Sequence, residues 1–77
     1  MIDQYDGKPF KVCEGNRPYV MVLPSQCDDV LEALKEHRIS ATISSSGIGV
    51  PDKGEIQIFE FAGERTAEEI AKILQEA

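Results

Sequence analysis

The sequence feature that most constrains the fold is an unbroken apolar run, YVMVLP, at residues 19–24. Its length and its β-branched content predict a central strand that is covered on both faces. The chain has only 77 residues, which is the size of one domain, and such a domain buries only about 60 % of the surface of its unfolded chain. The other elements must therefore be short, and they must pack around this run.

Strand and turn signals precede the apolar run. Residues 9–13, PFKVC, predict a first strand, and the EGNR that follows is typical of a turn because glycine and asparagine tolerate positive φ. Two extended runs around a short turn predict a hairpin. Residues 1–7 carry no such signal, and we expect them to form a loose N-terminal tail ahead of a single domain at 8–77.

Two amphipathic helices are predicted from apolar periodicity. The first begins near Ser25, a good N-cap residue, and its apolar stripe runs from Cys27 to Leu34 with helical spacing. The second begins at Thr66, which has Glu69 at the spacing of a capping box, and a second apolar stripe follows it.

Two further strands lie between the helices. Residues 39–44 alternate apolar and polar side chains, which predicts a half-buried strand at the edge of a sheet. Residues 55–61, EIQIFEF, are rich in residues that favour strands. We expect the segment between them, 44–54, to be a loop.

The order strand, strand, helix, strand, strand, helix predicts an α+β fold. A right-handed crossover through the first helix separates the second and third strands, and the fourth strand fits between them, antiparallel to both. We therefore expect a single four-stranded, mainly antiparallel sheet in the spatial order first, second, fourth, third, with both helices on one face. This is a circularly permuted ferredoxin-like arrangement, with its last strand moved to the front of the chain. The alternative is a minimal thioredoxin-like fold.

Composition argues against several classes of partner. The net charge is −6 and the eight basic residues are scattered along the chain, so we expect no nucleic acid and no membrane surface as a partner. There is no apolar run long enough to span a bilayer and no secretory leader pattern, which favours a cytoplasmic protein. Two cysteines and one histidine do not make a structural zinc site. We expect no metal and no cofactor.

The segment SSSGIGVPDKG, residues 44–54, resembles a ligand-binding loop more than any other part of the chain. A phosphate cradle uses glycine amides at the start of a helix. Here the glycine spacing matches no nucleotide-binding pattern and a strand follows, so a flexible connector is favoured over a site for a small anion. The turn that contains Asn16 and Arg17 is a second possible anion site. The possible ligand residues are thus Ser46, Gly47, Gly49, Lys53, Asn16 and Arg17.

Cys27 is a possible reactive thiol. It lies at the start of the first predicted helix, and helix N-termini lower the pKa of a thiol. However, position 24 is a proline, so there is no C-x-x-C motif, and Asp28 and Asp29 oppose formation of the thiolate. Cys27 also shares an apolar stripe with Leu34, which favours an inert thiol in the core.

No catalytic constellation accompanies these residues. His37 is the only histidine, and its place in the last turn of a helix explains it structurally. The acidic pairs 28–29 and 68–69 stand in first helical turns, where they suit the helix dipole. We therefore expect a protein without catalytic residues.

The two faces of the predicted central strands carry the functional hypothesis. Because both helices cover one face, an apolar set of side chains is left on the other, and such patches mark interaction surfaces. The alternative is that Ile2 and Tyr5 fold over this face. The expected interface residues are Tyr19, Met21, Leu23, Phe59 and Phe61.

We therefore expect a small non-catalytic interaction module that forms a homodimer or binds another protein through the exposed apolar sheet face. Two alternatives stay open. One is a thiol-redox protein that uses Cys27, and the other is a regulatory domain that binds a small anionic ligand.

Overall fold

The computed structural model describes residues 1–63 and 65–77. Its elements in chain order are β1 (Ile2–Asp3), β2 (Lys8–Pro9), β3 (Tyr19–Val22), the short 3-10 helix η1 (Pro24–Gln26), α1 (Cys27–Glu36), β4 (Ala41–Val50), β5 (Gly54–Phe61) and α2 (Ala67–Glu76). The fold is α+β, with two helices and antiparallel strands in two sheets of two and three strands.

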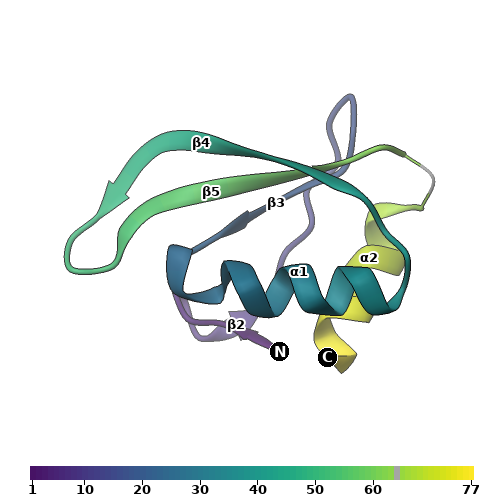
Figure 1. The fold of residues 1–77 in the computed structure, drawn as a ribbon, viewed down its shortest axis with the longest axis horizontal. Helices are drawn as coiled ribbons and strands as arrows, with labels where there is room; N and C mark the ends of the chain where they lie inside the picture. Colours follow the sequence, from purple (N-terminus) through teal and green to yellow (C-terminus); the bar gives the residue numbers. More distant parts are fainter. Residues whose placement is uncertain (64) are drawn as a thin grey trace.

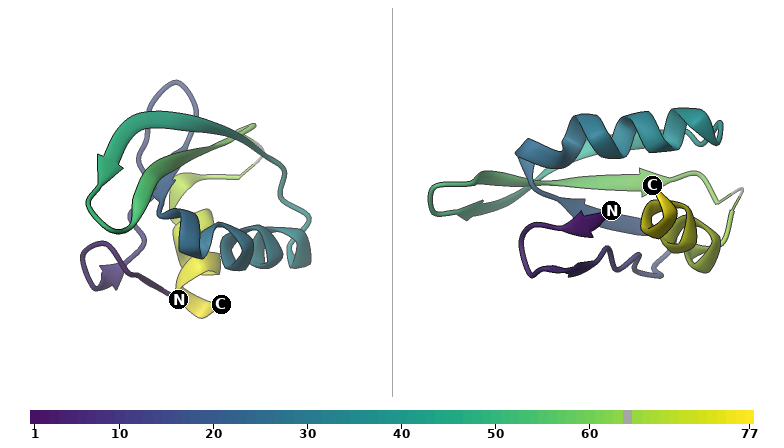
Figure 2. Two further views of the ribbon diagram at one scale, coloured as in Figure 1. Left: turned by 60° about the vertical axis from the view of Figure 1, so that its left-hand side comes forward. Right: turned by 90° about the horizontal axis from the view of Figure 1, so that it is seen from below.

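The main sheet has three strands in the order β3-β5-β4. β5 lies in the centre and is antiparallel to both neighbours, which confirms the prediction that the last strand fits between the two that precede it. Both helices lie on one face of this sheet, below the strands in Figure 1, and the two views of Figure 2 agree. The helices also contact each other, so sheet and helices form two layers.

The predicted first strand, residues 9–13, does not join the main sheet, and the expectation of a single four-stranded sheet is therefore wrong. Only Cys13 forms a bridge, with Tyr19. Pro9 pairs instead with β1 and has no N–H to donate to a ladder. Phe10 turns inward and is only 4 % exposed. Burying this aromatic ring favours a path under the sheet over one along the edge of β3.

The core lies between the main sheet and the helices. Phe59 and Phe61 of β5 supply its largest side chains, and they are 0 % and 1 % exposed. The other buried members come from β3, both helices and the N-terminal segment: Phe10, Val20, Val22, Val30, Ala33, Leu34, Ile70 and Leu74.

The β4–β5 hairpin is longer than expected, since most of the predicted loop 44–54 is strand. Only residues 51–53 form the turn. Asp52 within it and Gly54, the first residue of β5, have positive φ values of 64° and 88°. The glycine-rich stretch fits into β4 because a bulge between Ser45 and Gly49 absorbs extra residues. The hairpin extends past the body of the protein, at the left of Figure 1.

Residues 1–7 are not a loose tail but form a hairpin with β2 that is attached to the body. Gln26 is buried, at 3 % exposure, and its amide makes two hydrogen bonds to this segment. Its Nε2 donates to the carbonyl of Ile2 at 2.7 Å, and its Oε1 accepts from the amide of Gln4 at 2.8 Å. A buried amide needs such partners, so Gln26 and the N-terminal segment position each other.

The two helices begin differently. Thr66 caps α2 as predicted, because its side chain accepts a hydrogen bond from the amide of Glu69 at 3.2 Å. Ser25 does not cap α1, since it lies within η1 and α1 starts at Cys27 without a side-chain cap.

Candidate functional site

The open face of the main sheet is defined by the register of its strands. Met21 is paired with Ile58, whereas Val20 is paired with Phe59. Directly paired residues share a face, and Val20 is buried against the helices together with Phe59. Met21 and Ile58 therefore face away from the helices.

Phe59 and Phe61 cannot contribute to the predicted interface, because they lie on the helix face and are almost fully buried. Period-two alternation identifies two faces but does not say which one the helices cover. The two phenylalanines bury more area than the open-face residues would, and the structure uses them for the core.

A depression on the open face gathers apolar side chains. It encloses about 190 Å³, and we call it the apolar hollow. It lies where Leu23, just after β3, meets Ile48 of β4 and Ile56 of β5. Its lining residues are Asp3, Tyr5, Met21, Leu23, Ile48 and Ile56.

The apolar hollow has a buried floor and an exposed rim. Leu23 and Ile56 are 2 % and 7 % exposed, and they form the floor. Of the five large hydrophobic side chains that are exposed in the described part of the chain, three stand at the rim, namely Tyr5, Met21 and Ile48 at 58 %, 41 % and 51 %. A small pocket with an apolar floor, surrounded by exposed apolar groups, is typical of a protein-binding site.

The bulge in β4 places Ile48 at the rim. Gly47 has a φ of 74°, which a residue with a Cβ rarely adopts. The serine hydroxyls fix the bulge, because Ser45 Oγ accepts from the amide of Gly47 at 3.2 Å and Ser46 Oγ accepts from the amide of Ile48 at 3.0 Å. The segment that was expected to be a connector thus presents one apolar side chain.

The N-terminal segment supplies the opposite part of the rim. Asp3 and Tyr5 are held there by the hydrogen bonds of Gln26, and Asp3 Oδ1 also accepts from the amide of Tyr5 at 2.9 Å. The sequence left open whether Ile2 and Tyr5 cover the open face. Tyr5 borders the hollow without closing it, and Ile2 is 50 % exposed and is not among the lining residues.

Three of the expected interface residues lie on or near this face. Met21 and Leu23 line the apolar hollow, whereas Tyr19 is half-buried near the other end of β3 and lines no part of it. Sequence reasoning missed Ile48 as a site residue. One feature of the sequence could have indicated it: Ile48 stands between two glycines in a stretch of serines and glycines. An isoleucine with so few apolar neighbours along its own strand is unlike a core residue.

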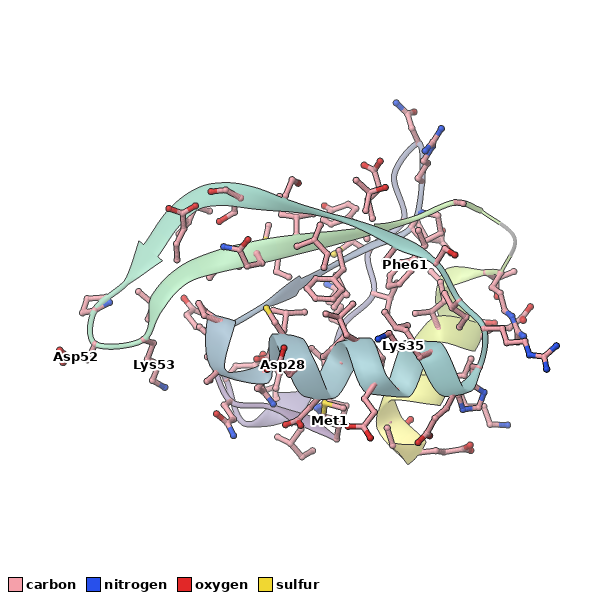
Figure 3. The ribbon with its side chains drawn as sticks, viewed as in Figure 1. Met1, Asp28, Lys35, Asp52, Lys53 and Phe61 are labelled. Carbon is pink, nitrogen blue, oxygen red and sulfur yellow. The ribbon has the colours of Figure 1, made fainter. Side chains whose placement is uncertain are left out.

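The possible ligand residues of 44–54 do not form an anion cradle. The amides of Gly47 and Ile48 already donate to serine hydroxyls, so they are not directed at a ligand. Lys53 Nζ donates to the carbonyl of Gln4 at 3.3 Å. Figure 3 shows Lys53 beside Asp52 at the tip of the hairpin.

Asn16 and Arg17 lie in an exposed turn that the structure does not bring near Lys53. This turn precedes Tyr19, which pairs with Glu60, whereas the hairpin tip is at the other end of β5. Figure 1 shows the two loops at opposite ends of the sheet. The two possible anion sites are therefore far apart, and their residues cannot combine to bind one ligand.

Cys27 is a poor nucleophile in this structure. Burial, with a smaller contribution from the charge of Asp28, raises the pKa of the Cys27 thiol above its ordinary value. The Sγ atom donates to the carbonyl of Leu23 at 3.5 Å. The thiolate, which is the reactive form, is thus disfavoured at neutral pH.

Alkylation of Cys27 by iodoacetamide should therefore be at least severalfold slower than that of a free cysteine at pH 8. The pH at which the alkylation rate is half-maximal should also be higher for Cys27 than for a free cysteine. Mass spectrometry of the alkylated peptide measures the rate. Asp28→Asn is the matched variant, because it removes the acidic neighbour and should accelerate the reaction. Rapid alkylation of native Cys27 at pH 7 would contradict this assignment and revive the redox alternative.

Cys13 is also a free thiol, on the bridge to Tyr19. A hydrogen bond with Cys13, together with the charge of its thiolate, raises the pKa of the Tyr19 phenol. The raised pKa keeps the Tyr19 phenol protonated to higher pH than an ordinary tyrosine, and Tyr19 lies half-buried on β3 at the edge of the open face.

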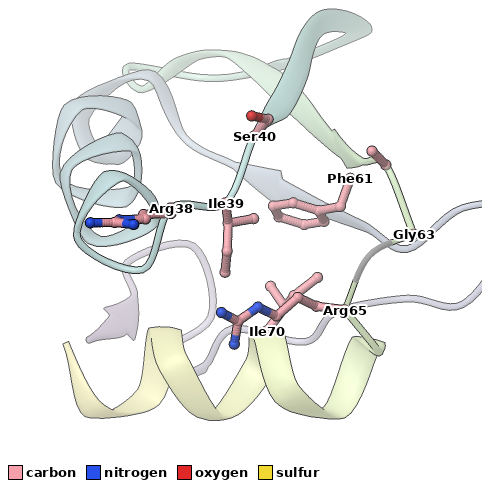
Figure 4. Close-up of a pocket in the computed structure, with 8 residues that line it drawn as sticks. Arg38, Ile39, Ser40, Phe61, Gly63, Arg65 and Ile70 are labelled. Carbon is pink, nitrogen blue, oxygen red and sulfur yellow. The ribbon is translucent and has the colours of Figure 1, made fainter.

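A second depression lies between the ends of the two helices (Figure 4). Its lining includes Arg38, Arg65 and Phe61, but it encloses only about 20 Å³, which is room for a single water molecule. Arg65 is already engaged, because its Nη1 lies 3.8 Å from Glu69 Oε2 and its Nη2 donates to the carbonyl of His37 at 3.5 Å. This cavity is too small for a metabolite.

Neither a metal centre nor a membrane-spanning element is found in residues 1–63 and 65–77. No three His, Cys, Asp or Glu side chains in that part of the chain are grouped to hold a metal ion. No helix there has the length and apolar character needed to cross a bilayer.

Comparison with known proteins gives no match to a family model, to a curated protein or to a solved structure. Functional inference for this chain therefore depends on the chemistry of its own surface. The apolar hollow is smaller than two other depressions in the described part of the chain, but its lining is more strongly apolar than theirs.

Proposed function

We propose that this protein is a non-catalytic interaction module that binds a protein partner through the apolar hollow on the open face of its sheet. The observation that carries the proposal is the clustering of Tyr5, Met21 and Ile48 around a buried apolar floor. Exposing these groups to water is unfavourable. A partner that covers them gains the free energy of burying them.

The geometry favours a partner that inserts one apolar side chain. The floor residues Leu23 and Ile56 are uncharged, and the volume of about 190 Å³ suits a leucine or an aromatic ring. Among the residues that the structure describes, Asp3 is the only charged one that lines the hollow, and the chain as a whole carries a net charge of −6. A basic group next to the inserted side chain would therefore be complementary.

Met21→Asp is expected to weaken binding of the natural partner by at least about 30-fold, which corresponds to the roughly 2 kcal/mol of a hot-spot residue. The charge would stand at the rim, where the partner must exclude water. Met21 is 41 % exposed, so the domain should stay folded. Partners captured from an extract by the immobilised protein can be quantified by mass spectrometry, and circular dichroism checks folding.

Asn16→Asp is the matched control, because it adds the same charge in an exposed turn that does not line the hollow. A genuine partner should be kept by the wild type and Asn16→Asp but lost by Met21→Asp and by Ile48→Asp. Equal capture by all four proteins would refute a role for the hollow.

Indole provides a direct probe of the same surface. Titrated into ¹⁵N-labelled protein, it should shift the amide signals of Met21, Ile48 and Ile56, and Ile48→Asp should abolish these shifts. Uniform small shifts across the open face would show that the depression does not bind apolar side chains.

A further inference from the structure

The outer edge of β4 is unprotected. β4 has ten residues and none of them is charged. One edge of the strand pairs with β5, and within residues 1–63 and 65–77 no strand pairs with the other. Residues 42–45 are all exposed. Natural proteins usually protect such an edge with lysine or proline, or by shortening the strand, because its free backbone groups can pair with another strand.

The opposite edge of the sheet is protected in these ways. β3 has only four residues, and Pro18 and Pro24 flank it. Beside it, Cys13 closes a bridge in which its amide donates to the carbonyl of Tyr19 at 2.7 Å, and the amide of Tyr19 donates back at 3.0 Å. The contrast identifies β4 as the edge that is available for pairing.

The exposure of Ile43 indicates that β4 lacks a neighbouring strand on its outer edge. It is paired with Phe59, so its side chain lies on the helix face of the sheet. Phe59 is 0 % exposed, yet Ile43 is 43 % exposed. The helices therefore leave part of the Ile43 side chain open to solvent. A strand added alongside β4 would place a side chain next to Ile43 and bury it.

The bulge restricts where another strand can pair. Regular pairing with β5 runs over 41–45 and resumes only at Gly49, so five residues centred on Ile43 form the straight part of the edge. When this segment pairs antiparallel with itself, Ile43 lies opposite Ile43 of the second copy. Thr42 then lies opposite Ser44, and Ala41 lies opposite Ser45. These pairs are apolar with apolar, hydroxyl with hydroxyl, and small with small, which suits a two-fold interface.

We propose that two copies of this protein associate through β4, with a two-fold axis at Ile43, to form one continuous six-stranded antiparallel sheet. A net charge of −6 on each copy opposes association over most of the surface. The β4 edge brings no charged side chain to the contact, so charge repulsion between the two strands is small there. This inference goes beyond the proposed function, since the apolar hollow takes no part in the contact.

The dimer would also place two apolar hollows on the same face of the joined sheet, because sheet continuation keeps each face continuous. A partner that carries two apolar anchors would then bind with an avidity that a single copy lacks.

Sedimentation equilibrium between about 5 μM and 1 mM tests the proposal. The wild type should shift with concentration from 8.5 kDa to twice that mass. Ile43→Asp should remain monomeric, since it sets two like charges on the axis. The double variant Thr42→Lys/Ser44→Lys changes only exposed side chains and sets one of the new lysines opposite Glu60, so it should fold even if Ile43→Asp does not. It should also be monomeric, because lysines would oppose each other across the two-fold axis. Ile48→Asp, which alters the hollow, should still dimerise.

Cysteine cross-linking tests the register. In a Cys13→Ser/Cys27→Ala background, Ile43→Cys should form a disulfide between copies under mild oxidation, because directly opposed residues lie within about 5.5 Å. Gly49→Cys, beyond the bulge, should not.

A wild type that is monomeric up to 1 mM overturns the proposal, and so does a dimer that survives the double variant. Loss of the dimer in Ile48→Asp alone would assign self-association to the hollow instead and overturn pairing through β4. The protein could instead stay monomeric while its β4 amide signals shift when an extended peptide from another protein is added. That result would overturn the dimer and assign the β4 edge to such a peptide. In a strict monomer, unchanged indole binding would show that the proposed function stands although the dimer does not.

Discussion

Phe59→Ala is expected to lower the free energy of unfolding by about 3–5 kcal/mol. Phe59 is fully buried in the central strand, where it lies between Val20 of β3 and Ile43 of β4. Removing its ring leaves a cavity that the flanking strands cannot close without breaking their pairing. A small domain has only about 5–15 kcal/mol of stability in total, so this variant should be close to unfolded at 37 °C. Urea denaturation followed by circular dichroism measures the change.

Ile58→Ala is the matched control for this prediction, because Ile58 is the adjacent residue on the open face and is only half-buried. Its cost should be well below that of Phe59→Ala. If the two variants lost similar stability, the assignment of the covered face would be wrong, and the apolar hollow would have to be part of the core.

Phe10→Ala should destabilise the protein by a similar amount, about 3–5 kcal/mol, although Phe10 belongs to no strand or helix. Its ring is 4 % exposed and joins the same core cluster as the two helices. Thermal unfolding should show a lower midpoint, and amide exchange should be accelerated throughout residues 1–13, since Phe10 anchors that segment.

Val12→Ala provides the comparison for Phe10. Val12 is half-buried and packs against the edge of the core, so its truncation should cost about 1 kcal/mol. A Phe10→Ala protein as stable as Val12→Ala would mean that the N-terminal segment is dispensable. In that case Asp3 and Tyr5 would not be held at the rim of the hollow.

The two aromatic residues show different limits of sequence reasoning. Phe59 was recognised as a strand residue, but its strand is apolar on both faces, so alternation could not decide which face is covered. Phe10 lies in a run with strand-like composition, and local propensity predicted an edge strand there. Burial of one ring and the missing N–H of Pro9 outweighed that propensity.

The candidate site was predicted in part. Met21 and Leu23 were expected at an exposed apolar face, and both line the hollow. Ile48 was not expected, because its place at the rim depends on a bulge whose position is set by pairing with β5. Tyr5 reaches the rim through the hydrogen bonds that Gln26 makes to Ile2 and Gln4. These partners are 24 and 22 residues away from Gln26 in the sequence, and a local sequence pattern does not predict contacts between residues so far apart.

The sequence by itself determined the type and order of the main elements and the central position of β5. These depend on apolar periodicity, on caps such as Thr66 and on the handedness of chain crossovers, which act over short distances or apply generally. Only the tertiary structure decided that the phenylalanines of β5 face the helices, that β4 continues through the glycine-rich stretch and that residues 1–12 lie outside the main sheet. Those outcomes depend on which distant side chains fill the same volume, and a close-packed interior accepts only one solution.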